Sequence, residues 1–274
     1  MKTWHHALST ADAAPKTAPI LLTGSVQENL AKAKKLGYEA IEVHTRPDVV
    51  WDYEAINEQM ARDEMRIAAI ITGRLNTEGK CSLIDDRPYV VEAAMKGMYQ
   101  YIDMAQKLHS NIVLGWVKGN VPPHGNRETY LARLAHNLRP LAEYAGEREV
   151  KIFAEVINRY EVNIFTNAAE TMQFIMEWNL ENVYVHLDTF HMNIEETNPY
   201  DAIRLCKGKL GYFHIADNTR SYPGSGQICF APILKTLEEI GYNGYLSVEC
   251  LPGEDNEETA RKALRRLKGI EQKY

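Results

Sequence analysis

The chain has 274 residues, of which 45% are hydrophobic and 25% are charged, as is typical of a globular protein with a large core. Its formal net charge of −6 disfavours a dedicated nucleic-acid binder, which normally carries a basic excess. No apolar run approaches the roughly 18 residues that predict a membrane-spanning helix, and the first residues lack the apolar stretch of a signal peptide. We therefore expect neither a nucleic-acid partner nor a membrane partner.

Short apolar runs alternate with amphipathic stretches along the whole chain, and no Pro/Gly-rich linker divides it. Eight runs are predicted to be strands: residues 3–8, 40–43, 66–71, 111–114, 151–155, 183–187, 210–215 and 245–249. These runs are short and almost wholly apolar, as parallel strands buried on both faces are.

The segments between these runs are predicted to be helices. Ser25 and Glu28 are spaced as a capping box, and the apolar period that follows them ends at Gly37. Asn167 begins a second such period, and Gly241 ends a third. Eight strand-then-helix units without a GxGxxG or GxxxxGK[ST] loop favour a barrel over an open sheet. The predicted fold is α/β, a single (β/α)₈ TIM-barrel domain spanning residues 1–274.

The cysteines are widely spaced and form no CxxC pair: Cys81, Cys206, Cys229 and Cys250. Such usage is typical of proteins of the reducing cytosol and not of a disulfide framework. We therefore expect a cytoplasmic protein.

Ligand-capable side chains end the last four predicted strands, about one βα unit apart: Glu155, Asp188, His214 and Glu249. The carboxyl ends of barrel strands meet at one rim, where barrel enzymes build their active sites. Three carboxylates and one imidazole suit a moderately hard divalent ion, and the absence of cysteine from the set disfavours structural zinc. Each residue alone is more typical of a hydrogen-bond or salt-bridge partner, but four in register predict a shared metal site.

The segments around these four residues resemble a known family: residues 155–161 (EVINRYE), 187–196 (LDTFHMNIEE), 213–220 (FHIADNTR), 223–226 (PGSG) and 245–251 (YLSVECL). They resemble the xylose-isomerase-like sugar isomerases and epimerases, and among these the ketose 3-epimerases of D-tagatose and D-psicose. Weaker pieces of the first half look closest to 5-keto-L-gluconate epimerase: residues 9–14 (STADAA), 72–73 and 115–119 (GWVKG).

Some positions depart from the family pattern. Val156 and Ile157 replace a Pro-Leu pair, which is a conservative change for the site. Gln227 stands where the family has a histidine, and Cys229 stands where an acidic residue is common. The last two changes leave the substrate preference open.

The resemblance implies an isomerase: a metal-dependent ketose 3-epimerase that acts on a free keto-sugar or a keto-hexonic acid such as 5-keto-L-gluconate. Glu155, Asp188, His214 and Glu249 resemble the family's metal ligands, with Mn²⁺ expected first and Co²⁺ or Mg²⁺ as alternatives. The ion would hold the C2 carbonyl and C3 hydroxyl oxygens and stabilise a cis-enediolate. Glu155 and Glu249 would be the catalytic pair that removes and returns the C3 proton.

Further roles follow from the same resemblance. Glu161, His191 and Arg220 would bind substrate oxygens, and the protein would be a homo-oligomer, a dimer or a tetramer. A keto-acid needs an additional cation, for which Arg74 and Lys118, after the third and fourth strands, are the candidates; solvated rim charges are the alternative. Glu42 and His44 end the second strand and face the rim. They either contact the metal ligands from behind or are ordinary polar groups of the rim. Three tryptophans are expected to pack in the core and not against a sugar: Trp4, Trp51 and Trp116.

Competing functions stay open. Hydroxypyruvate isomerase or another aldose–ketose isomerase would use the same metal site and return the proton to a different carbon. Endonuclease IV shares the barrel, but it needs a histidine-rich zinc cluster and a surface that binds DNA, which the acidic charge disfavours. A non-catalytic sugar-binding barrel would have no need of two intact carboxylates.

Overall fold

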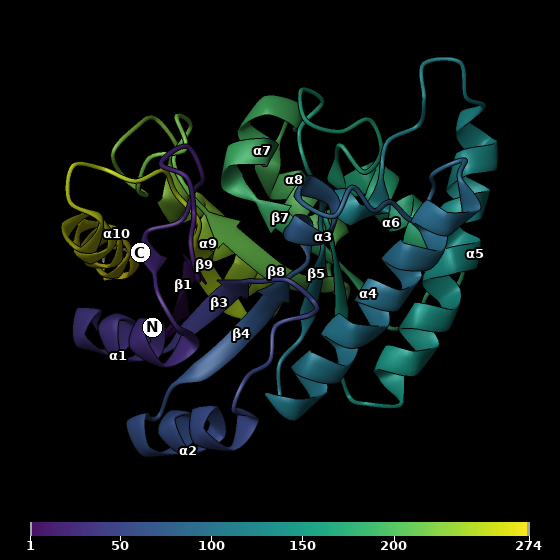
Figure 1. The fold of residues 1–274 in the computed structure, drawn as a ribbon. Helices are drawn as coiled ribbons and strands as arrows, with labels where there is room; N and C mark the ends of the chain where they lie inside the picture. The colour runs from purple at the N-terminus through teal and green to yellow at the C-terminus, as the bar shows by residue number, and fades with distance from the viewer. Residues whose placement is uncertain (1, 273–274) are drawn as a thin grey trace.

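The computed structural model describes residues 2–272 and shows a closed parallel barrel surrounded by helices (Figure 1). The pairing of β1 with β9 closes the barrel, and the short β2 pairs with the carboxyl end of β1, at Thr10 and Ala11, beyond the part that pairs with β9. The strands are β1 (His5–Ala11), β2 (Leu22–Thr23), β3 (Ala40–His44), β4 (Arg66–Ile71), β5 (Ile112–Leu114), β6 (Ile152–Glu155), β7 (Val183–Asp188), β8 (Leu210–Ile215) and β9 (Tyr245–Val248). The predicted barrel fold is confirmed.

Helices cover the outer face of the barrel, and α10 lies beside α1 where the two ends of the chain come together (Figure 1). The helices are α1 (Val26–Leu36), α2 (Tyr53–Asp63), α3 (Gly73–Thr77), α4 (Pro88–Lys107), α5 (Arg127–Gly146), α6 (Ala168–Glu177), α7 (Thr189–Glu195), α8 (Pro199–Leu205), α9 (Phe230–Glu239), α10 (Asn256–Glu271) and the 3₁₀ turn η1 (Trp116–Lys118). Among the described residues, none of these helices has both the length and the apolar character needed to cross a membrane.

The caps read from the sequence are confirmed. Ser25 and Glu28 form both bonds of a capping box at the start of α1, and Gly37 ends that helix with a left-handed backbone, φ 91°. The Asn167 side chain accepts a hydrogen bond from the Glu170 backbone at the start of α6.

Alternate residues of each strand face the inside of the barrel, because side chains of a strand point to opposite faces in turn. A small cluster of buried residues fills much of the interior: Ala7, Ala40, Ala68, Ala69, Ile71, Val113, Phe153 and Tyr212. On β3 and β8 the residues two positions beyond Ala40 and Tyr212 are the polar Glu42 and His214. The interior therefore changes from apolar to polar toward the rim that carries the candidate site.

The first strand differs from the prediction. It spans His5–Ala11 and not residues 3–8, and the preceding Trp4 packs in the core. Ser9, Thr10 and Ala11 extend the strand because they pair with β3. Residues of β3 bond both hydroxyl groups: the Ser9 hydroxyl lies 3.0 Å from His44 Nε2, and the Thr10 hydroxyl donates to the Glu42 carbonyl at 2.8 Å.

Candidate active site

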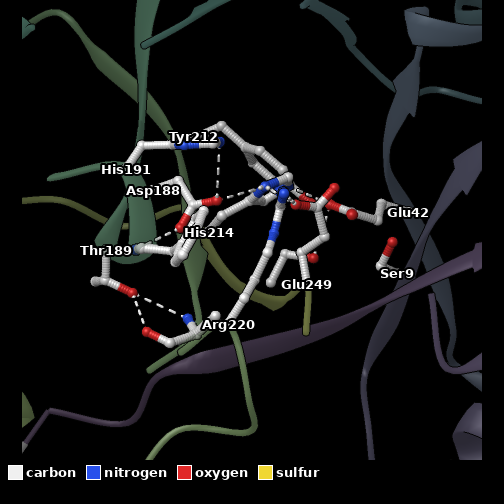
Figure 2. Close-up of polar contacts among 12 residues, drawn as sticks. Ser9, Glu42, Asp188, Thr189, His191, Tyr212, His214, Arg220 and Glu249 are labelled. Atoms are coloured by element: carbon white, nitrogen blue, oxygen red, sulfur yellow. Dashed lines mark hydrogen bonds and ion pairs between the residues drawn. The ribbon is translucent and has the colours of Figure 1, made fainter. Parts of the chain in front are cut away.

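The four predicted ligands meet at the carboxyl rim of the barrel. Glu155 ends β6, Asp188 ends β7, His214 lies in β8, and Glu249 directly follows β9. The β7–β8 ladder pairs Asp188 with His214. One ligand atom each of Asp188, His214 and Glu249 lies within 4.8 Å of the others, and Glu155 forms a second such group with Asp188 and His191. All four predicted ligands are at least 92% buried. Figure 2 shows Asp188, His214 and Glu249 close together.

The unbonded atoms of this cluster fit a divalent cation. His214 Nδ1 lies 3.5 Å from Glu249 Oε2 and 3.9 Å from Asp188 Oδ2. Neither His214 Nδ1 nor Asp188 Oδ2 has a hydrogen-bond partner among the described residues. Buried polar atoms are almost always bonded, and buried carboxylates need compensation of their charge. One nitrogen and several carboxylate oxygens facing the same space make a donor set suited to Mn²⁺, Co²⁺ or Mg²⁺.

The carboxyl groups of the cluster differ in their affinity for a proton. Burial, together with the charge of Glu249, raises the pKa of Glu155 to about 8. Burial also raises the pKa of Asp188, to about 6. Burial acts in the same direction on Glu249, but His214 and Arg220 outweigh it and lower the pKa of that carboxyl. Carboxyl groups whose pKa values are separated in this way are suited to different roles in proton transfer.

Glu42 lies behind His214, fully buried inside the barrel (Figure 2). Its Oε2 atom is 2.8 Å from His214 Nε2 and accepts hydrogen bonds from the Tyr212 hydroxyl at 2.9 Å and the Ser247 hydroxyl at 2.8 Å. A proton on Nε2, donated to this carboxylate, leaves Nδ1 of His214 free to face Asp188 and Glu249. This geometry matches the first of the two interpretations of Glu42, a contact behind the candidate ligands.

Glu161, His191 and Arg220 line the same cavity of about 530 Å³ as Glu155 and Glu249. Arg220 Nη2 donates to Glu249 Oε2 at 2.6 Å, and its Nη1 lies 3.8 Å from Glu161 Oε1. The His191 ring is fixed through Nδ1, 2.7 Å from Asn158 Nδ2. Burial and the charge of Arg220 lower the pKa of His191, so the ring stays neutral.

The loop that carries Arg220 is organised by Asp217, which the sequence analysis missed. The Asp217 carboxylate accepts hydrogen bonds from four backbone N–H groups, those of Asn218, Gly224, Gly226 and Ile228. A Cβ atom at Gly226 would lie 2.4 Å from Asp217 Oδ1, so this close approach requires glycine. The sequence signal for this loop is the Asp-x₆-Gly-x-Gly spacing directly after a predicted strand.

The two candidate cations for a substrate carboxylate lie in different surroundings. Arg74 lines the cavity but is paired with Asp12 and with Glu78, whose Oε1 is 2.6 Å from Arg74 Nε. Lys118 is fully buried, does not line the cavity, and donates from Nζ to the Gly115 carbonyl at 3.2 Å. Burial lowers the pKa of Lys118 to about 8.

The tryptophans divide between core and cavity. Trp4 is buried in the core and Trp51 packs against it, as expected. Trp116 is 38% exposed and lines the cavity, so its assignment to the core was wrong. It lies in the 3₁₀ turn that follows β5, where the chain leaves the barrel and the side chain reaches the rim.

Comparisons with known proteins agree with this geometry. A family model described as a xylose isomerase-like TIM barrel matches residues 30–270. The D-psicose 3-epimerase of Enterocloster bolteae is 31% identical over 226 residues, which cover 80% of this chain and 74% of that protein. The L-ribulose 3-epimerase of Methylomonas sp. is 29% identical over 228 residues, 82% of this chain and 78% of that one. A solved structure of an L-ribulose 3-epimerase superimposes with a TM-score of 0.83 at 26% identity, covering 97% and 94% of the two chains.

Proposed function

We propose, from the premise that the chain belongs to the xylose isomerase-like TIM barrel family, that it is a metal-dependent epimerase acting at C3 of a keto-sugar. The observation that carries the proposal is that two buried carboxylates, Glu155 and Glu249, line one cavity and that each clusters with Asp188 as a possible metal ligand. The cluster of Glu249 and Asp188 also includes His214. The relatives named for ketose 3-epimerisation support the reaction type. A free ketose is the first candidate substrate, and a keto-hexonic acid such as 5-keto-L-gluconate is the second.

Glu155, Asp188, His214 and Glu249 would hold one divalent ion, Mn²⁺ first and Co²⁺ or Mg²⁺ as alternatives. When bound, such an ion supplies a Lewis acid that makes the carbon next to a carbonyl more acidic. Glu42 holds the His214 ring in place, and Arg220 holds Glu249.

Inversion at C3 requires a proton to leave one face of the carbon and another to arrive on the opposite face. We assign the two faces to Glu155 and Glu249. Both carboxylates line the cavity, so in one direction of the reaction one of them removes the C3 proton and the other returns a proton to the opposite face. The roles are exchanged in the reverse reaction.

The remaining cavity residues would bind the substrate. Arg220 offers its guanidinium to the oxygen on which negative charge develops. The neutral His191 and the partly exposed Glu161 would bind hydroxyl groups. The four free thiols support a reducing, cytoplasmic location, and a homo-oligomeric assembly remains part of the proposal.

The test is to incubate the metal-free protein with D-fructose, D-tagatose, L-ribulose and 5-keto-L-gluconate in D₂O, adding Mn²⁺, Co²⁺ or Mg²⁺ in turn. Products are followed by NMR. We expect metal-dependent inversion at C3 with deuterium incorporated at that carbon.

Two results would overturn the proposal. Deuterium at C1 or C2 with an aldose product would identify an aldose–ketose isomerase. Metal binding without exchange on any substrate would favour a barrel that binds sugars without catalysis.

A further inference from the structure

A second cavity, of about 770 Å³, adjoins the catalytic cavity at the rim. Its lining comes from segments 76–87, 116–122 and 161–162, which follow β4, β5 and β6; we call it the side groove. Thr77, Trp116 and Glu161 line both cavities, so the two spaces are neighbours on the rim. A ligand in the catalytic cavity that carries a second ring would place that ring near these three side chains.

The charges of the side groove favour an uncharged ligand. Three carboxylates and two cationic side chains line it: Asp85, Asp86, Glu161, Lys80 and Arg87. Both cations are already engaged. Arg87 donates from Nε and Nη2 to the two oxygens of Asp85 at 2.8 and 2.9 Å, and Lys80 donates to the Thr77 carbonyl at 2.9 Å. The other two carboxylates also have cationic partners, because Arg133 pairs with Asp86 at 2.9 Å and Arg220 lies 3.8 Å from Glu161. Since these charges are largely compensated within the protein, the groove offers no concentrated positive charge to a phosphate or carboxylate.

One exposed aromatic residue lines this groove, and two others lie close in the chain to residues that line it. Among residues 2–272, the exposed large aromatic side chains are Tyr89, Trp116 and Tyr160, at 66%, 38% and 82% exposure. Trp116 lines the groove, the Tyr89 ring lies 5.8 Å from the guanidinium carbon of Arg87, and Tyr160 precedes Glu161 in the chain. Aromatic rings bury much area at little conformational cost and pack well on the C–H face of a sugar ring.

We propose that the side groove is a subsite for a second, uncharged sugar ring attached to the ketose away from C3. Trp116 would contact both rings because it lines both cavities. The Ser82 side chain, which also lines the groove, would bind a hydroxyl group of the second ring. The substrate range would then extend from free ketoses to ketoses carrying a second ring, which bind better. This inference rests on the proposed epimerase function.

The test compares D-fructose with isomaltulose and lactulose, ketoses that carry a second ring at C6 and C4, and with fructose 6-phosphate. The metal-loaded protein is assayed by deuterium exchange at C3. We expect kcat/KM for at least one disaccharide to exceed that for D-fructose by about tenfold or more, with the phosphate poorest.

Two substitutions of the exposed Asn120 separate the groove from the rest of the site. Its side chain accepts a hydrogen bond from the Asn163 backbone, and both variants lose this bond equally. Asn120→Trp fills the groove, whereas Asn120→Ala leaves it open. We expect Asn120→Trp to abolish the advantage of the disaccharide, with kcat/KM for D-fructose changed less than about twofold, and Asn120→Ala to retain that advantage.

The outcomes distinguish the two proposals. If D-fructose is epimerised but neither disaccharide is preferred, or if Asn120→Trp lowers both activities equally, the subsite does not exist. A preference for the phosphate would contradict the charge argument. If nothing is epimerised, the proposed function fails, and saturation-transfer NMR then decides the subsite: disaccharide binding sensitive to Asn120→Trp supports it, and insensitive or absent binding overturns it.

Discussion

The two arcs of the barrel rim differ in what they bring to the same cavity. The late arc, after β6 to β9, provides most of the ionisable groups that line the cavity: Glu155, Glu161, His191, Arg220 and Glu249. Asp188 and His214 of the same arc are buried next to Glu249. The early arc, after β1 to β5, provides mainly small or apolar surface, such as Ala11, Ile71 and Gly115. One arc therefore supplies the reacting groups and the other shapes the space in front of them.

Two residues link the arcs. Glu42 of β3 belongs to the early arc, yet its carboxylate holds His214 of the late arc. Gly115 of the early arc leaves room for Glu155 of the late arc, because a Cβ atom at residue 115 would lie 2.8 Å from Glu155 Oε2. The shape of the early arc and the charges of the late arc thus depend on each other.

The largest expected effect is in the late arc. Glu249→Gln removes one of the two proton-transfer groups, and we expect kcat to fall by about 10²–10⁴-fold. Because Glu155 still works on one face of the carbon, deuterium should exchange slowly at C3 without inversion. NMR in D₂O at saturating metal measures both rates. Inversion within tenfold of the wild-type rate would exclude Glu249 from the catalytic pair.

The next effect tests the link between the arcs. Glu42→Gln replaces the carboxylate that receives the His214 Nε2 proton, so we expect Mn²⁺ affinity to weaken by about 10–100-fold. Isothermal titration calorimetry measures this without any substrate. Glu39→Gln, which removes a partly exposed carboxylate at the opposite end of the same strand, is the control and should leave the affinity unchanged. Equal Mn²⁺ affinity of the two variants would mean that Glu42 stabilises the barrel interior and does not affect metal binding.

A smaller effect is expected from the shape of the early arc. Gly115→Ala would push against Glu155 Oε2, and we expect kcat to fall on the order of tenfold through this displacement. Gly73→Ala is the matched control, because Gly73 lines the same cavity and has nothing within 4 Å of the added carbon. If the two variants are equally active, the contact of Gly115 with Glu155 does not constrain catalysis.

The smallest effect concerns a charge of the early arc. Arg74 is neutralised by Asp12 and Glu78, so Arg74→Gln should change KM for a neutral ketose by less than about twofold. The same variant assayed with 5-keto-L-gluconate shows whether Arg74 serves a substrate carboxylate. A tenfold rise in KM for the keto-acid alone would identify it as the carboxylate-binding residue.

The sequence was more informative about the late arc than about the early one. Glu155, Asp188, His214 and Glu249 each follow an apolar run at one βα spacing, which predicts both the strand and the rim position. The end of β1 was missed because the polar Ser9 and Thr10 interrupt the apolar run, although pairing with β3 makes them part of the barrel.

Other features depend on distant partners that no local pattern reveals. Arg74 meets Asp12 from a different loop. The left-handed backbone of Arg220, φ 58°, follows from the turn that Asp217 and the glycines build after β8. Trp116 was assigned to the core because tryptophan is a large, mostly apolar residue. Its side chain is exposed because it lies in the turn that leaves the barrel after β5.

The ladder between β1 and β9 joins opposite ends of the described chain, which gives the barrel a high contact order. During synthesis β1 emerges early, and the edge that pairs with β9 stays unpaired until β9 has been made. An unpaired strand edge promotes aggregation. Ser247 reaches Glu42 only when this ladder forms. Translation of the final strand is therefore the step at which the nascent chain both loses its exposed edge and completes the support beneath His214.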